Sequence, residues 1–160
     1  MRTHKALAFG AGVAAGPFVE ASSLGLRGDP TADQTDALRS ALETAARRKA
    51  VLRLPKGIVR VTDLDMSGPV RIAGRPGASL QATDRATYVI SVTDGPVWMH
   101  GVHMDGRFAG HRDGPALLEV RNASEVLLDS CTIRRGKGNL VNLEKCRGEV
   151  RNCLLEKAFT

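Results

Sequence analysis

The feature that most limits how this chain can fold is a repeat of short apolar segments 22 residues apart. Its clearest copies place Leu128, Cys131 and Ile133 in register with Val150, Cys153 and Leu155. Apolar and polar residues alternate in each copy, which is typical of short strands. Such strands cannot bury an apolar face by themselves, but coils stacked about 4.8 Å apart bury it between them. The constant step therefore predicts a β-solenoid.

The same pattern continues upstream with insertions between the copies. Within residues 96–106, the four apolar positions are Val97, Met99, Val102 and Met104, and Gly101 lies at the break between two short strands. Residues 69–74 match residues 96–101 at a step of 27. Side chains alternate along a strand, so the residues expected to point outward are Trp98, His100, His103 and Asp105. Insertions between coils usually form loops on one face, often the binding face.

One amphipathic helix is expected ahead of the coils, at residues 33–48. Its apolar stripe consists of Ala37, Leu38, Ala41, Leu42, Ala45 and Ala46. We interpret the nearby Asp29, Asp33 and Asp36 as capping residues, because a calcium site usually needs six or more oxygen ligands. After this helix, Gly and Pro separate short apolar runs and no helical period persists. The sequence thus predicts an all-β fold with a single N-terminal helix that caps it.

The first 21 residues have the features of an export signal peptide. A basic start precedes a weakly apolar run that is too short to span a bilayer, and cleavage is expected after Ala21. We expect no membrane span in the remaining chain. Residues 10–15 match a dinucleotide-binding pattern, but no βαβ unit follows, so nucleotide binding is not expected. The chain then divides into an opening segment with the capping helix, residues 22–50, and the coils, residues 51–160.

Composition favours a narrow aliphatic core and a basic surface. Apolar residues make up 42% of the chain but aromatic residues only 4%, which suits stacked Val, Ile, Leu and Ala. The formal net charge is +6. Such a surface favours an acidic polymer as partner, although an ordinary solvated surface has the same composition. We expect no nucleic acid as partner.

Three segments resemble the opening of right-handed parallel β-helix proteins of the pectate-lyase superfamily. They are residues 25–29, residues 33–38 and residues 54–61, the last with a Leu-Pro-x-Gly turn. Residues 101–106 resemble a recurrent coil segment of the same proteins. Within the superfamily the chain is most similar to bacterial exported repeat proteins of uncharacterised function, which typically carry a twin-arginine signal that this sequence lacks.

The resemblance implies a single-stranded right-handed β-helix and a periplasmic or extracellular location. With the basic surface, the resemblance implies an acidic polysaccharide as partner, which the chain would bind or process. If the chain is an enzyme, the resemblance implies a polysaccharide lyase or a glycoside hydrolase. Calcium is possible as a cofactor by the resemblance alone, and no other cofactor is expected. We find no matching set of the catalytic residues that these enzymes use, and expect an incomplete solenoid without a C-terminal cap.

Polar and aromatic side chains around the central repeat form the candidate binding wall. We predict substrate binding by Trp98, His100, His103, Asp105, Arg107 and Arg134. An indole face can stack on a sugar ring, and a guanidinium can bind a uronate carboxylate through two hydrogen bonds. Asp105 and His103 are the candidates for acid or base catalysis. The insertion at residues 107–113 is expected beside this wall.

Several alternatives remain open from the sequence. The same chain could be a structural or adhesive solenoid without catalysis, and it could form a homo-oligomer. The histidine spacing gives no fixed ligand geometry, so no metal is expected. Cys131 and Cys153 should stack one coil apart, either as small apolar side chains or as a disulfide. Cys146 is the third cysteine and does not belong to this pair.

Overall fold

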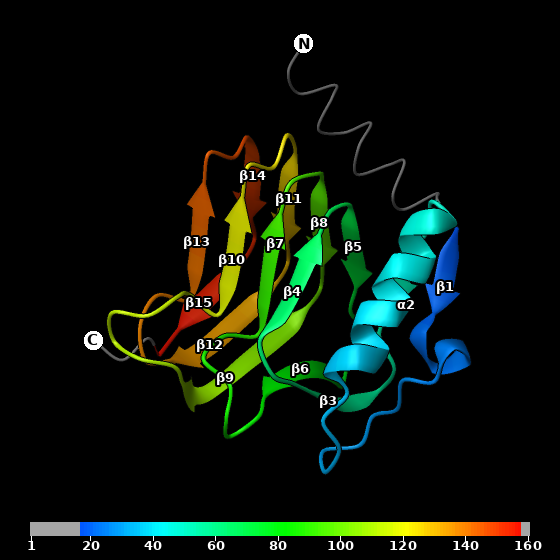
Figure 1. Cartoon of the computed structure of the whole chain (residues 1–160), viewed down its shortest axis with the longest axis horizontal. Helices are drawn as coiled ribbons and strands as arrows, with labels where there is room; N and C mark the ends of the chain where they lie inside the picture. The colour runs from blue at the N-terminus through cyan, green and yellow to red at the C-terminus, as the bar shows by residue number, and fades with distance from the viewer. Residues whose placement is uncertain (1–16, 158–160) are drawn as a thin grey trace.

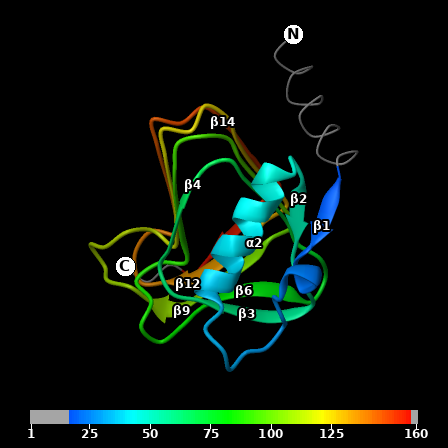
Figure 2. The ribbon, with the colours of Figure 1, turned by 45° about the vertical axis from the view of Figure 1, so that its right-hand side comes forward.

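The computed structural model describes residues 17–157 as a right-handed parallel β-solenoid of about four turns with one short helix near the N-terminus. The predicted fold class is therefore confirmed. Three parallel sheets form the sides of the solenoid, and from β2 onward the chain visits sheets A, B and C in that order in each turn (Figures 1 and 2). Consecutive strands of one turn lie in different sheets, so each strand pairs with strands of the neighbouring turns. All of these pairs are parallel.

The strands of each sheet are as follows. Sheet A contains β1 (Phe18–Glu20), β2 (Val51–Arg53), β5 (Val70–Ala73), β8 (Val97–His100), β11 (Val126–Asp129) and β14 (Gly148–Arg151). Sheet B contains β3 (Gly57–Val61), β6 (Ala78–Ala82), β9 (His103–Ala109), β12 (Thr132–Gly136) and β15 (Leu154–Glu156). Sheet C contains β4 (Leu64–Ser67), β7 (Ile90–Thr93), β10 (Leu118–Arg121) and β13 (Val141–Glu144).

The strand register is the one that the repeat predicts. Leu128 pairs with Val150, and Ile133 pairs with Leu155. The insertion upstream does not disturb this register, since Val97 pairs with Val126. Residues one coil apart therefore share an environment, and their apolar side chains stack along the solenoid axis.

A two-residue corner joins sheet A to sheet B in the later coils. The first residue of the corner is Gly101, Ser130 or Asn152, with φ of 62°, 57° and 54°. This left-handed conformation turns the chain sharply, and glycine, serine and asparagine all adopt it here. The break that separates the two strands of each repeat is thus the corner of the solenoid.

Helix α2 (Thr35–Arg47) closes the N-terminal end of the solenoid. Before it come β1 and the short 3-10 helix η1 (Ala21–Leu24). The turn that leads into α2 is held by Asp33, which accepts hydrogen bonds from the N–H and hydroxyl of Thr35 at 3.0 and 2.5 Å. The predicted capping helix is confirmed, and it packs against β2, β4 and β5. Its buried stripe is Leu38, Ala41, Leu42 and Ala45.

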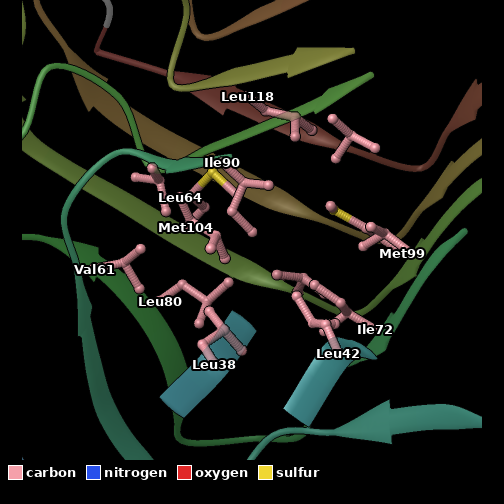
Figure 3. Packing of buried hydrophobic residues seen from close by; sticks show 14 of the residues in the cluster. Leu38, Leu42, Val61, Leu64, Ile72, Leu80, Ile90, Met99, Met104 and Leu118 are labelled. Carbon is pink, nitrogen blue, oxygen red and sulfur yellow. The ribbon is translucent and has the colours of Figure 1, made fainter. Parts of the chain in front are cut away.

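A narrow aliphatic core fills the space between the three sheets and α2. Burial of this apolar surface, at roughly 25 cal/mol per Å², is what holds successive coils together. The side chains of the core are essentially inaccessible to solvent. Figure 3 shows residues from the helix and from all three sheets in one cluster, among them Leu38, Leu42, Leu64, Ile72, Leu80, Ile90 and Met104.

The cysteines are free thiols in the described residues. Cys131 is buried, whereas Cys146 and Cys153 are half-buried. Burial raises the pKa of the Cys131 thiol to about 12, and the neighbouring Cys153 adds to that shift. Of the two predicted possibilities, the structure contains the stacked thiols rather than the disulfide.

The predicted signal peptide lies mostly outside the described residues. Its last part forms β1, which pairs with β2, and the expected cleavage point falls just after this strand. Export therefore stays a prediction. Within residues 17–157, no helix combines the length and apolar character that crossing a membrane requires.

Candidate functional site

The corner at Gly101 divides the predicted binding wall between two sheets. His100 ends β8 on sheet A, and His103 begins β9 on sheet B. Asp105 and Arg134 are paired neighbours on sheet B. The structure thus brings these two residues and His103 onto one side of the solenoid, and it places His100 and the rest of β8 on another. The six predicted residues do not form one continuous surface.

Trp98 does not offer the open ring face that alternation along the strand predicts. It points away from the core, but the register places Leu127 of the next coil beside it. The indole packs in a separate small cluster with Val51, Ala73 and Leu127 and is only 5% exposed. The ring of His100 stacks beside it, with centroids 5.8 Å apart. A sugar ring could reach this indole only if the cluster repacked.

Asp105 is the second predicted residue that is not open to a ligand. It is 3% exposed and accepts two hydrogen bonds from Arg135, from Nε at 2.8 Å and from Nη2 at 2.5 Å. The backbone N–H of Arg107 donates a third at 2.9 Å, and Arg134 lies 3.6 Å away. Alternation correctly places Asp105 on the outer face, but the arginines of the next coil cover it.

The surroundings of Asp105 determine its ionisation. Burial by itself would raise the pKa of this carboxyl, but the hydrogen bonds from Arg135 and the Arg107 N–H, with the charges of Arg135 and Arg134, hold the pKa below its ordinary value. A carboxylate held in this way is a poor general acid or base near neutral pH. We therefore interpret Asp105 as a structural carboxylate that positions the end of β9.

The end of β9 bulges away from the sheet just after Asp105. The pairing with β12 shifts between Arg134 and Gly136, and Arg107 and Phe108 have left-handed φ of 49° and 59°. A bulge of this kind bends a strand and redirects its side chains. Here it leaves the side chains of Arg107 and Phe108 exposed at the corner between sheets B and C.

A cavity of about 340 Å³ lies at this corner, between the loops of neighbouring coils. We call it the corner cavity. Arg85, Arg107 and Lys137 give it three cationic side chains against the one carboxylate of Asp84. Asp84 binds Arg107 at 2.9 Å and lies 3.6 Å from Arg60. The complete lining is Thr83, Asp84, Arg85, Ala86, Thr87, Arg107, Phe108, Ala109, Gly110, His111 and Lys137.

Two loops hold the corner cavity in shape. Asp63 accepts hydrogen bonds from the N–H groups of Thr87 and Tyr88 at 2.7 and 3.0 Å, which holds the first loop in place. The second loop touches the first at Gly110, which has φ of +89°. A Cβ on Gly110 would lie 2.6 Å from the Thr87 carbonyl oxygen, so this close approach requires glycine.

Of the six predicted binding residues, Arg107 alone lines the corner cavity in the part of the chain that the structure describes. The prediction missed Arg85 and Lys137, which come from the coils before and after the central repeat. A signal was available for Arg85, because it lies in the long insertion between β6 and β7. Lys137 lies in the short connection between β12 and β13, in a coil without an insertion, so the sequence pattern gave no signal for it.

Another buried carboxylate, Glu119, lies on sheet C and was also missed. It is 4% exposed and accepts hydrogen bonds from the Ala116 N–H at 2.6 Å and from the Asn142 side chain at 2.9 Å. These contacts occupy its oxygens and link two coils. Among residues 17–157, no group of three or more His, Cys, Asp or Glu side chains is arranged to hold a metal ion.

Comparison with known proteins finds no family model, no curated protein and no solved structure that matches this chain. A function must therefore be argued from the geometry and charge of the corner cavity.

Proposed function

We propose that this protein binds an acidic polysaccharide through its uronate carboxylates in the corner cavity. The observation that carries the proposal is the excess of cations in the lining, three against one carboxylate. Guanidinium groups bind carboxylates through paired, charge-assisted hydrogen bonds. A recessed cationic site of this kind selects an anionic chain over a neutral one.

Two of the three cations are well placed for an incoming carboxylate. Arg85 and Lys137 are exposed, and they come from different loops of the lining. Arg107 already binds Asp84, so a ligand would share this guanidinium. Phe108 adds an apolar ring at the same place, which suits the apolar face of a sugar.

We propose binding rather than processing as the activity of the coils. Asp105, the predicted acid or base, is committed to Arg135, which supports a structural role. We also propose, on the motifs of residues 25–61, that the chain belongs with exported β-helix proteins of the pectate-lyase superfamily. That assignment rests on the resemblance, and the solenoid is compatible with it.

The alternative function is that of a structural or adhesive solenoid. It is favoured by the covered outward side chains of the central coils, because Trp98 and Asp105 pack against neighbouring coils instead of facing a ligand. A purely structural solenoid would not distinguish acidic from neutral oligosaccharides, so one binding experiment separates the two functions.

The experiment is calorimetric titration with an oligogalacturonate and with a neutral galactose oligomer of the same length. We expect binding of the acidic oligomer only, and weaker binding as salt is raised. Arg85→Ala and Lys137→Ala should each weaken binding by about tenfold, the value of one charged hydrogen bond. Lys56→Ala is the matched control, because Lys56 is exposed at the corner between sheets A and B.

Three results would count against the proposal. They are an absence of binding to the wild-type chain, equal binding of the neutral oligomer, and equal loss of affinity in Lys56→Ala. The last result would indicate attraction by net charge without a defined site.

A further inference from the structure

Asp84 is the carboxylate of the corner cavity, and its contacts differ from those of a structural carboxylate. Its side chain is 84% exposed, and both of its ion pairs use the same oxygen, Oδ1. Nη1 of Arg107 donates to this oxygen at 2.9 Å, whereas Nη2 of Arg60 lies 3.6 Å away. Asp105, in the next strand of sheet B, is 3% exposed and accepts three hydrogen bonds. Asp84 can therefore leave its partners readily, because exposed ion pairs contribute little to stability.

Arg60 is a mostly buried cation whose hydrogen-bond donors are incompletely used. It lies in β3, and its side chain is 16% exposed. Nη1 donates to the carbonyl oxygen of Pro30 at 3.2 Å, while the Nε–H is buried and has no hydrogen-bond partner among the described residues. A buried charge with unfilled hydrogen bonds is unfavourable. A carboxylate that approached this guanidinium more closely than Asp84 does would therefore be stabilised there.

The two guanidinium groups come from the coils on either side of Asp84. Arg60 lies in β3, Asp84 just after β6, and Arg107 in β9. These three strands lie side by side in sheet B (Figure 1). A carboxylate has two oxygens, so one held at this place can give one oxygen to each guanidinium. Asp84 contacts both groups through a single oxygen and leaves this arrangement incomplete.

A ligand carboxylate that binds Arg107 competes with Asp84. Two carboxylates at one guanidinium repel each other, which favours the departure of the one that is held less tightly. An acidic oligomer has further carboxylates for Arg85 and Lys137, which line the same cavity. Such multiple contacts hold the oligomer more tightly than its individual groups would be held.

We propose that a uronate carboxylate of the ligand takes the place of Asp84 between Arg60 and Arg107, and that the Asp84 side chain rotates into solvent. This inference rests on the proposed function, because the ligand is the acidic polysaccharide of the corner cavity. Asp84 is then an internal competitor that occupies the carboxylate position when no ligand is bound. A single uronate must displace it with fewer contacts than an oligomer makes, so Asp84 favours the polymer over the free sugar.

The first test is calorimetric titration of an oligogalacturonate into the wild-type chain and into Asp84→Asn. Removal of the competing charge should lower the Kd at least about fivefold. Asp113→Asn is the matched control for charge alone, because Asp113 is exposed and lies two residues beyond His111 of the lining. It should lower the Kd by less than about twofold. Urea denaturation should show wild-type stability for Asp84→Asn, since the side chain is exposed.

The outcomes separate this inference from the proposed function. If the wild-type chain binds the oligomer and Asp84→Asn binds it equally or more weakly, the exchange is wrong and the proposed function stands. That result would indicate that Asp84 stays in place and accepts hydrogen bonds from sugar hydroxyls. An equal gain in Asp113→Asn would also overturn the exchange, because it would reduce the effect to net charge. If neither chain binds the acidic oligomer, the proposed function fails and the exchange fails with it.

The second test uses the wild-type chain and needs no change at Asp84. NMR resonances of the arginine Nε–H groups are recorded with and without the oligogalacturonate, and Arg60→Lys and Arg107→Lys chains assign the two signals. We expect both signals to shift on binding, because the ligand carboxylate contacts both guanidinium groups. A shift of the Arg107 signal without one of the Arg60 signal would mean that Asp84 keeps its place, and would overturn the proposal.

Discussion

At the scale of single residues, Asp105 shows that alternation along a strand predicts the face on which a side chain lies but not whether another residue covers it. Alternation along β9 places its side chain on the outer face, which makes it a catalytic candidate. The contact with Arg135 then removes it from solvent, and the two residues are 30 positions apart in the sequence. Their meeting depends on the stacking of β9 against β12.

We predict that Asp105→Asn lowers the free energy of unfolding at pH 7 by about 1–3 kcal/mol, because it weakens charge-assisted hydrogen bonds. The folded-state pKa of Asp105 is depressed, so its stabilisation is present above the ordinary pKa of 3.8 and is lost as pH falls through the folded pKa. The difference between the two proteins in urea denaturation should therefore shrink in acid. Asp113→Asn, an exposed control, should match the wild type at both pH values.

At the scale of elements, the corners explain which glycines the fold requires. Gly101 has φ of +62° and open space around its Cβ position. Asn152 adopts the same conformation at the equivalent corner. Gly74 precedes Gly101 by one coil, and a Cβ on Gly74 would lie 1.9 Å from the Gly101 carbonyl oxygen. Glycine is therefore required at position 74 by a close backbone approach, whereas position 101 requires only the left-handed conformation.

We predict that Gly101→Asn changes the free energy of unfolding by less than about 1 kcal/mol, because asparagine tolerates the left-handed conformation. Gly74→Ala should cost about 2 kcal/mol or more, because backbone must move to admit the methyl group. Thermal or urea unfolding of the two variants measures the difference. Equal costs would contradict the assigned corner geometry.

The strand pairing predicts a second contrast, between adjacent positions of β12. Ile133→Asp should cost several kcal/mol, roughly 3–5, because it buries an unpaired charge between coils. Thr132→Asp introduces the same charge on the outward side and should cost under about 1 kcal/mol. Urea denaturation of both variants tests the inward and outward assignment, and the reverse order would refute it.

At the scale of the whole molecule, the two ends of the solenoid differ. Helix α2 covers one end, while the last coil at the other end keeps exposed apolar side chains. Because each coil contacts mainly its neighbours, local opening should begin where a coil has a neighbour on one side.

We predict that amide hydrogen exchange in β13, β14 and β15 is at least about tenfold faster than in β7, β8 and β9. The measurement is hydrogen–deuterium exchange of the 160-residue chain, followed by mass spectrometry of peptides from each coil. Uniform exchange along the coils would show that the solenoid opens as one cooperative unit.

The sequence by itself determined the solenoid, its 22-residue register and the capping helix. These features follow from the period of apolar residues, and burial of those residues is the largest favourable contribution to folding. Only the tertiary structure decided which outward-facing side chains are accessible to a ligand. Trp98 and Asp105 are covered by neighbouring coils, whereas Arg85, Arg107 and Lys137 meet at one corner. The physical reason is that exposure depends on what the adjacent coil places beside a residue, and a strand's own alternation does not contain that information.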